Sequence, residues 1–68
     1  MTRIDKIRKA LVLASKNLKD QNYTQAQEYF EQATKLDPKS WTIQNNLGII
    51  YKKLGQYQNA IDIFQKII

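Results

Sequence analysis

Apolar residues recur every three or four positions along the whole chain, which is the spacing of one face of an α-helix. The clearest run covers residues 47–64, where two such stripes lie on either side of Gly55. Because glycine readily adopts the left-handed conformation that ends many helices, we expect Gly55 to join two short helices. The rest of the chain repeats this helix–turn–helix pattern less completely.

Cap and turn signals divide the chain into four predicted helices. Thr2 followed by Asp5 resembles a capping box, and Ser40 is a typical N-cap residue. Asn22 tolerates left-handed geometry and can also cap the helix that follows. Pro38 ends the second helix, because the residue before a proline is driven out of the helical region. The predicted helices run from near Arg3 to the turn at 20–22, from Tyr23 to Leu36, from Trp41 to Leu54, and from residue 57 to the end.

The sequence also overlays on itself when it is shifted by 34 residues. The matched residues are of the types that helices bury, as a repeated packing unit requires. At the small positions Ala14 and Gly48, we expect the two helices of a unit to approach closely, with a phenylalanine filling the next turn. The matching pairs are Leu13 with Leu47, Tyr23 with Tyr57, Ala26 with Ala60, and Phe30 with Phe64.

This period and these residues resemble the tetratricopeptide repeat, whose pattern is W-x2-L-G-x2-Y, then A-x3-F, then P. Residues 41–68 carry Leu47-Gly48-x2-Tyr51 and Ala60-x3-Phe64, and residues 7–40 carry Ala26-x3-Phe30 and Leu36-Asp37-Pro38. The resemblance implies an all-α fold, in which antiparallel helix pairs form a short right-handed superhelical α-solenoid. It also implies a single domain over 1–68: an extension at 1–6, a first repeat at 7–40 and an incomplete second repeat at 41–68.

Three positions depart from the family pattern. The family's tryptophan position falls on Gln44, while Trp41 lies one turn earlier, where we expect it to pack between the two units. Asn17 stands where the second unit has Tyr51, so the first unit lacks that aromatic side chain. Gln21 replaces the turn glycine, which costs stability if the left-handed geometry is kept.

The residue inventory argues against catalysis. The 68 residues contain no cysteine, no histidine and only six carboxylates, so the commonest metal ligands, general base and thiol nucleophile are missing. We therefore expect no enzyme activity, no metal and no cofactor, and we interpret Glu28 and Glu31 as a solvated helix face. No apolar run approaches the ~18 residues of a membrane span. We expect no membrane insertion and a cytoplasmic location.

The chain is basic, with a formal net charge of +5. Such a surface favours acidic peptides, nucleic acid or anionic membranes, although basic side chains also serve only to solvate an exposed face. Nucleic-acid binding through the first helix is therefore an alternative function. Against it, aromatic residues do not alternate with the basic ones, as base-stacking platforms require. The basic residues of the first twenty positions are Arg3, Lys6, Arg8, Lys9, Lys16 and Lys19.

The resemblance implies a function in protein–protein interaction. In the family, the first helix of each unit lines a concave groove that holds a peptide, a helix or a partner subunit. The cations among the matching positions favour an acidic peptide, and the asparagines could bond its backbone. These positions are Arg8, Leu11, Ser15 and Lys19 in the first unit, and Asn45, Asn46, Ile49, Lys52 and Lys53 in the second.

The last predicted helix has more apolar residues than one buried stripe needs. Repeat proteins bury such faces against neighbouring units. Two interpretations stay open: these residues meet across a homo-oligomer, or the chain is a fragment of a longer repeat array. The residues concerned are Ile61, Ile63, Phe64, Ile67 and Ile68.

Overall fold

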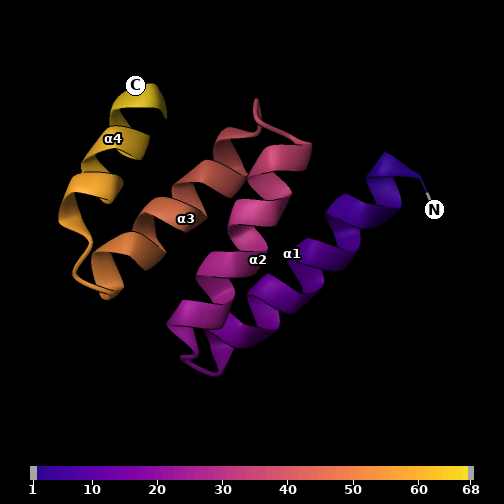
Figure 1. The fold of residues 1–68 in the computed structure, drawn as a ribbon, viewed down its shortest axis with the longest axis horizontal. Helices are drawn as coiled ribbons and strands as arrows, with labels where there is room; N and C mark the ends of the chain where they lie inside the picture. The colour runs from indigo at the N-terminus through magenta and orange to yellow at the C-terminus, as the bar shows by residue number, and fades with distance from the viewer. Residues whose placement is uncertain (1, 68) are drawn as a thin grey trace.

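The chain folds into four α-helices in a computed structural model that describes residues 2–67. The helices are α1 (Arg3–Lys19), α2 (Tyr23–Leu36), α3 (Trp41–Lys53) and α4 (Tyr57–Ile67). They follow one another across the molecule in chain order, each antiparallel to the one before, so that the N-terminus and α4 lie at opposite ends (Figure 1). Each helix packs on the next, within a flat body of 34 × 27 × 13 Å. The predicted all-α fold of antiparallel helix pairs is confirmed.

The caps explain where the helices begin. The Asp5 amide donates to Thr2 Oγ1 at 3.2 Å while the Thr2 amide donates to Asp5 Oδ2 at 3.3 Å, which completes a capping box. Ser40 Oγ accepts from the Ile43 amide at 3.4 Å. Asn22 behaves differently from the prediction, because its side chain makes no cap hydrogen bond and instead donates to Asn17 Oδ1 at 3.5 Å.

The turn inside each unit is a Schellman motif, and the two turns are equivalent. In the α1–α2 turn, the Gln21 and Asn22 amides donate to the Leu18 and Asn17 carbonyls at 3.0 and 2.8 Å. The α3–α4 turn repeats both bonds exactly 34 residues later, at 3.1 and 2.8 Å. The left-handed residues are Gln21, with φ 63°, and Gly55, with φ 78°. The strained residue is thus Gln21 and not Asn22.

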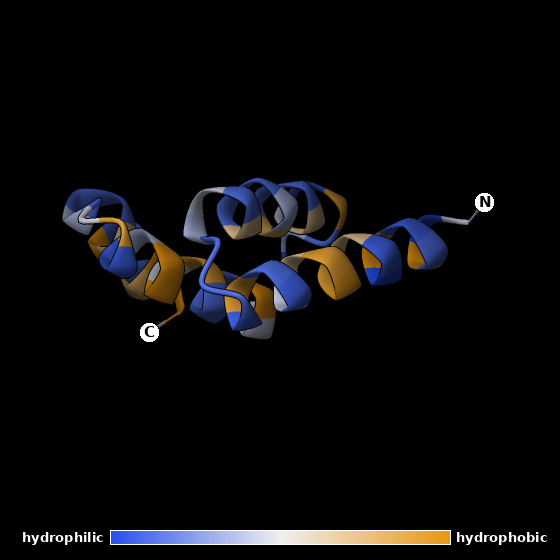
Figure 2. Cartoon of the chain, turned by 90° about the horizontal axis from the view of Figure 1, so that it is seen from below, coloured by the Kyte–Doolittle hydropathy of each residue, from blue (hydrophilic) through white to orange (hydrophobic). Residues whose placement is uncertain are grey.

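The core is built largely from small residues, so the helices lie close together. Half of its buried members are alanines, and its largest fully buried side chains are Phe30 and Ile50. In Figure 2, apolar and polar stretches alternate along every helix, as amphipathic helices require. The buried hydrophobic residues are Ala10, Ala14, Ala26, Phe30, Ala33, Ile43, Leu47, Ile50, Tyr51 and Ala60.

Two apolar side chains that the helical spacing or the repeat pattern would place inside lie outside. Ile4 continues the buried stripe of α1 but is 62% exposed. The reason is length: α1 has 17 residues against 14 in α2, and Arg3 Nε already donates to the last α2 carbonyl, that of Leu36, at 2.6 Å. Trp41, expected to pack between the units, is 65% exposed.

Gly48 allows α4 to approach α3. A Cβ atom at this position would lie 2.8 Å from both Cε1 and Cζ of Phe64, and 3.3 Å from Cγ2 of Ile63. Contacts of 2.8 Å are too short for carbon atoms, so the Phe64 ring occupies the space that the glycine leaves open. The expectation of close packing at this position is confirmed.

Exchanging the two turn residues should change stability in opposite directions. We expect Gln21→Gly to stabilise the chain by about 1 kcal/mol, because a left-handed non-glycine residue is strained by roughly that amount. Gly55→Gln should destabilise it by a similar amount. Urea unfolding followed by circular dichroism measures both variants. Equal stability of Gln21→Gly and the wild type would show that Gln21 is not strained.

The loss of stability caused by a substitution at Gly48 should rise steeply with the size of the new side chain. We expect Gly48→Leu to cost about 1–3 kcal/mol, since it forces the Phe64 ring and α4 away from α3. Gly48→Ala should be close to neutral, because the half-exposed ring can turn outward and alanine favours a helix over glycine by about 1 kcal/mol. The first unit carries Ala14 at the equivalent position. A neutral Gly48→Leu variant, in the same unfolding experiment, would contradict this packing.

Candidate functional site

The residues predicted to line a groove lie on α1 and α3, and the structure leaves all of them at least partly open to solvent. The two helices run in the same direction, with α2 packed between them in the chain of contacts (Figure 1). Arg8, Ser15 and Lys19 are exposed on α1, as are Ile49, Lys52 and Lys53 on α3. Leu11, Asn45 and Asn46 are half-buried. We call these nine residues the groove face.

Helical spacing explains why these side chains share one side of each helix. On α1, Arg8, Ser15 and Lys19 follow one another at steps of seven and four. On α3, Asn45, Ile49 and Lys52 do so at steps of four and three. Leu11 differs from the others because it also packs against the buried core, so only part of its side chain is available to a ligand.

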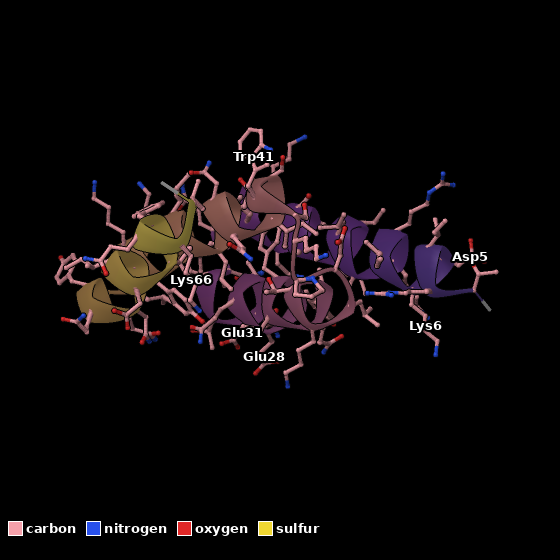
Figure 3. All side chains as sticks on the ribbon, turned by 90° about the horizontal axis from the view of Figure 1, so that it is seen from above. Asp5, Lys6, Glu28, Glu31, Trp41 and Lys66 are labelled. Atoms are coloured by element: carbon pink, nitrogen blue, oxygen red, sulfur yellow. The ribbon has the colours of Figure 1, made fainter. Side chains whose placement is uncertain are left out.

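Trp41 belongs to the same stripe and was missed as a functional candidate. It precedes Asn45 by four residues and Ile49 by eight, so the spacing alone could have placed it on the groove face. In Figure 3, Trp41 projects to the side opposite Glu28 and Glu31. Val12, one helical turn after Arg8, is 67% exposed and adds an open aliphatic side chain on α1.

Charge is distributed unevenly between the helices. Helix α1 carries six Arg and Lys residues against the single Asp5, which is a net +5 and equals the formal charge of the whole chain. Helix α3 adds Lys52 and Lys53. Helix α2 has Glu28 and Glu31 against Lys35, a net −1, and its two glutamates face away from Trp41 (Figure 3). The groove face itself carries four of these cations, Arg8, Lys19, Lys52 and Lys53, and no carboxylate.

A hollow opens between α2 and α4, across α3. This cleft has a volume of about 440 Å³ and mixed charge, with an acid and a lysine from each flanking helix. At its base, Tyr51 Oη donates to Glu31 Oε2 at 2.8 Å, which links the second unit to the first. The lining residues are Glu31, Thr34, Lys35, Leu47, Tyr51, Asn59, Asp62, Ile63 and Lys66.

The hydrogen bond from Tyr51 gives Glu31 a structural role. Burial raises the pKa of Tyr51 to about 12, with further contributions from the hydrogen bond to Glu31 and from the charge of that carboxylate. Glu31 is thus held as an acceptor in the junction between the units, while Glu28 lies exposed one turn away. Among residues 2–67, the structure contains no group of three or more His, Cys, Asp or Glu side chains that could hold a metal ion.

The apolar residues of α4 lie on more than one side of the helix. Atoms of Ile63 and the tip of the Phe64 ring approach Gly48 on α3, and both side chains stay half-buried, as does that of Ile67. Ile61 faces outward and is 47% exposed. Ile68 lies outside the described residues. No helix within residues 2–67 is both long and apolar enough to cross a membrane.

Replacing Tyr51 should reveal its coupling to Glu31 through pH. Because the folded pKa lies above the ordinary value near 10, the phenol contributes stability that is complete below pH ~10 and lost as the pH rises through ~12. We expect Tyr51→Phe to cost about 1 kcal/mol at pH 7. The difference from the wild type should shrink between pH ~10 and ~12.

Urea unfolding across this pH range measures the effect, with Tyr57→Phe as the control. Tyr57 is 62% exposed, so its loss should change neither the stability nor the pH profile. A wild-type advantage over Tyr51→Phe that stays constant from pH 9 to pH 12 would contradict the assigned coupling.

Comparison with known proteins bears on the repeat seen in the structure. The tetratricopeptide repeat family matches residues 11–68. Searches of curated proteins and of solved structures gave no significant match. The match covers the second half of α1 and all of α2, α3 and α4, and the two equivalent Schellman turns repeat the same unit in three dimensions. The chain therefore belongs to the tetratricopeptide repeat family, whose repeats generally mediate protein–protein interaction.

Proposed function

We propose that this chain is a protein-interaction module and that its groove face binds an acidic segment of a partner protein. The observation that carries the proposal is the combination of exposed cations and open apolar side chains on two helices that run in parallel. Arg8 and Lys19 supply charge on α1, and Lys52 and Lys53 supply it on α3. A peptide that lies across both helices would meet positive charge on either side.

Apolar contacts support the same ligand. Trp41 and Val12 are each about two-thirds exposed, at 65% and 67%, and Ile49 is 38% exposed. Burying one such side chain contributes about 1.5–3 kcal/mol, whereas a single exposed charge pair contributes less than about 1 kcal/mol. An acidic segment with apolar residues among its carboxylates therefore fits the groove face better than a purely acidic one.

Binding of nucleic acid through α1 is the second candidate, because that helix alone carries a net charge of +5. Two features of α1 weigh against it. The helix contains no aromatic residue on which bases could stack. Its cations also point to different sides, since Lys6 and Lys9 line a cleft between α1 and α2 while Arg8 lies on the groove face.

Charge reversal should separate the groove face from the rest of the surface. We expect the double variant Lys52→Glu/Lys53→Glu to weaken binding of a synthetic acidic, leucine-containing peptide about tenfold or more, since two attractions become repulsions. The matched control is Lys35→Glu/Lys66→Glu, which changes the net charge equally at the cleft between α2 and α4. That control should bind almost as the wild type does.

Trp41 provides the measurement, because it is the only tryptophan of the chain. Its emission should shift to shorter wavelength when a ligand covers it, and circular dichroism confirms that each variant stays helical. Equal losses in both double variants would show that binding depends on net charge and not on the groove face.

A single-stranded oligonucleotide tested alongside the peptide addresses the alternative. If it binds more tightly than the peptide, with an affinity that falls steeply as salt rises, the α1 hypothesis is favoured instead.

A further inference from the structure

We propose that two copies of this chain associate through the outer stripe of α4, formed by Tyr57, Ile61 and Phe64, to give a closed two-fold dimer. This surface is distinct from the groove face, so the proposal stands independently of peptide binding. Tyr57 is 62% exposed, Ile61 is 47% exposed and Phe64 is half-buried. Spacings of four and three residues place all three on one side of the helix.

The internal repeat shows what this stripe is suited to bind. Helix α4 occupies the place in the second unit that α2 occupies in the first, and α2 is covered by α3. Phe30 is therefore only 1% exposed, whereas its counterpart Phe64 keeps part of its ring open. In the described part of the chain, α4 makes its main packing contact with α3. Within residues 2–67, the stripe therefore lacks the cover that α3 gives to α2.

The α4 stripe is also more apolar than its counterpart on α2. On α2, Gln27 Oε1 accepts from Gln56 Nε2 at 3.3 Å, a polar contact with the second unit. Ile61 stands 34 residues after Gln27 and replaces that amide with an aliphatic side chain. A partner for α4 therefore needs an apolar surface, and not a set of matching hydrogen bonds.

The opposite end of the molecule does not offer such a surface. The α3 residues that pack against α2 include Ile43 and Tyr51, which are 4% and 8% exposed. At the equivalent positions, α1 carries Lys9 and Asn17. Docking α4 of one copy onto this end of another would place a lysine and an amide where the second unit buries Ile43 and Tyr51, which is unfavourable against an apolar stripe. Head-to-tail growth is disfavoured, and a contact of α4 with α4 remains.

The distribution of charge between the helices also favours a contact of α4 with α4. Among the four helices, α4 alone has no net charge, because Asp62 balances Lys66, whereas α1 holds +5. Two copies that meet through α4 keep their cationic α1 helices at the far ends of the dimer (Figure 1). Their mutual repulsion is then smallest, because the separation of the charged helices exceeds the Debye length of about 8–10 Å.

The spacing of the stripe makes it self-complementary. Ile61 lies near its centre, so two antiparallel copies of α4 can place Ile61 against itself at the two-fold axis. Tyr57 of each copy then lies across from Phe64 of the other, which forms two aromatic pairs. Since two 11-residue helices make a contact below the standard interface size, we expect dissociation constants in about the micromolar to millimolar range.

Sedimentation of the whole chain over a concentration series tests the proposal. We expect the wild type to pass from monomer to dimer and no further, and Ile61→Lys to weaken the dimer about tenfold or more. The matched control is Val12→Lys, which introduces the same charge at an exposed aliphatic residue of α1 and should leave the dimer intact. Circular dichroism shows whether both variants stay folded.

A cross-link provides an independent measurement. Because the chain has no cysteine, Ile61→Cys introduces a single thiol, which should form a disulfide-linked dimer on mild oxidation if residue 61 lies at the two-fold axis. Val12→Cys should cross-link far less. A wild type that stays monomeric to millimolar concentration, association that continues beyond the dimer, or equal cross-linking of the two cysteine variants would overturn the proposal.

The salt dependence of dimerisation distinguishes an apolar contact from one that is held by charge pairs. We expect the dimer to persist or tighten as sodium chloride rises from about 0.05 to 0.5 M, because salt screens the repulsion between two copies that each carry +5. A dimer that dissociates as salt rises would be held by charge pairs and would contradict an apolar α4 contact.

Discussion

The packing of α2 against α3 turns two helical hairpins into one body. Neither hairpin has much to bury alone, since short helices in water depend on tertiary contacts for their stability. At this junction, Phe30 and Ala33 on α2 and Ile43 and Ile50 on α3 are all almost completely buried. The hydrogen bond from Tyr51 to Glu31 adds a polar link at its edge. The relative placement of α1 and α3, and hence the groove face, follows from this contact.

The fold could be read from the sequence because it depends on local signals and on a repeat. The capping box at Thr2, the cap at Ser40 and the left-handed Gly55 each concern a few neighbouring residues, and the structure contains all three. The 34-residue overlay then supplied the packing of Gly48 under Phe64, because a small residue and a ring recur together in both units. Such signals do not depend on how far each helix extends.

The errors arose where the extent of packing decides the outcome. Ile4 continues the buried stripe of α1, but α2 ends before it can cover that turn. Trp41 was expected between the units because it lies one turn before the family's tryptophan position, yet its side chain is 65% exposed. Asn22 has the chemistry of a cap, but its side chain bonds to Asn17 instead. Periodicity shows which residues share a face, but not where the neighbouring helix ends.

The groove face could be predicted only as a set of positions. The sequence, through its resemblance to the family, named residues on α1 and α3, and the structure leaves them open to solvent. The six cations of α1 could be counted in the sequence, but the sequence could not show that α2 turns Glu28 and Glu31 to the side opposite Trp41. That asymmetry depends on how the helices are rotated about their axes when they pack.

The order of the helices has a consequence for how the molecule moves. Because each helix packs mainly on its neighbours in the chain, most tertiary contacts join residues that are close in sequence, and such folds form rapidly. A helix at either end can also detach without disturbing the junction of α2 and α3. Amide hydrogens should therefore exchange fastest in α1 and α4 and slowest in the two central helices. The two proposed binding surfaces then lie partly on the helices that open most often.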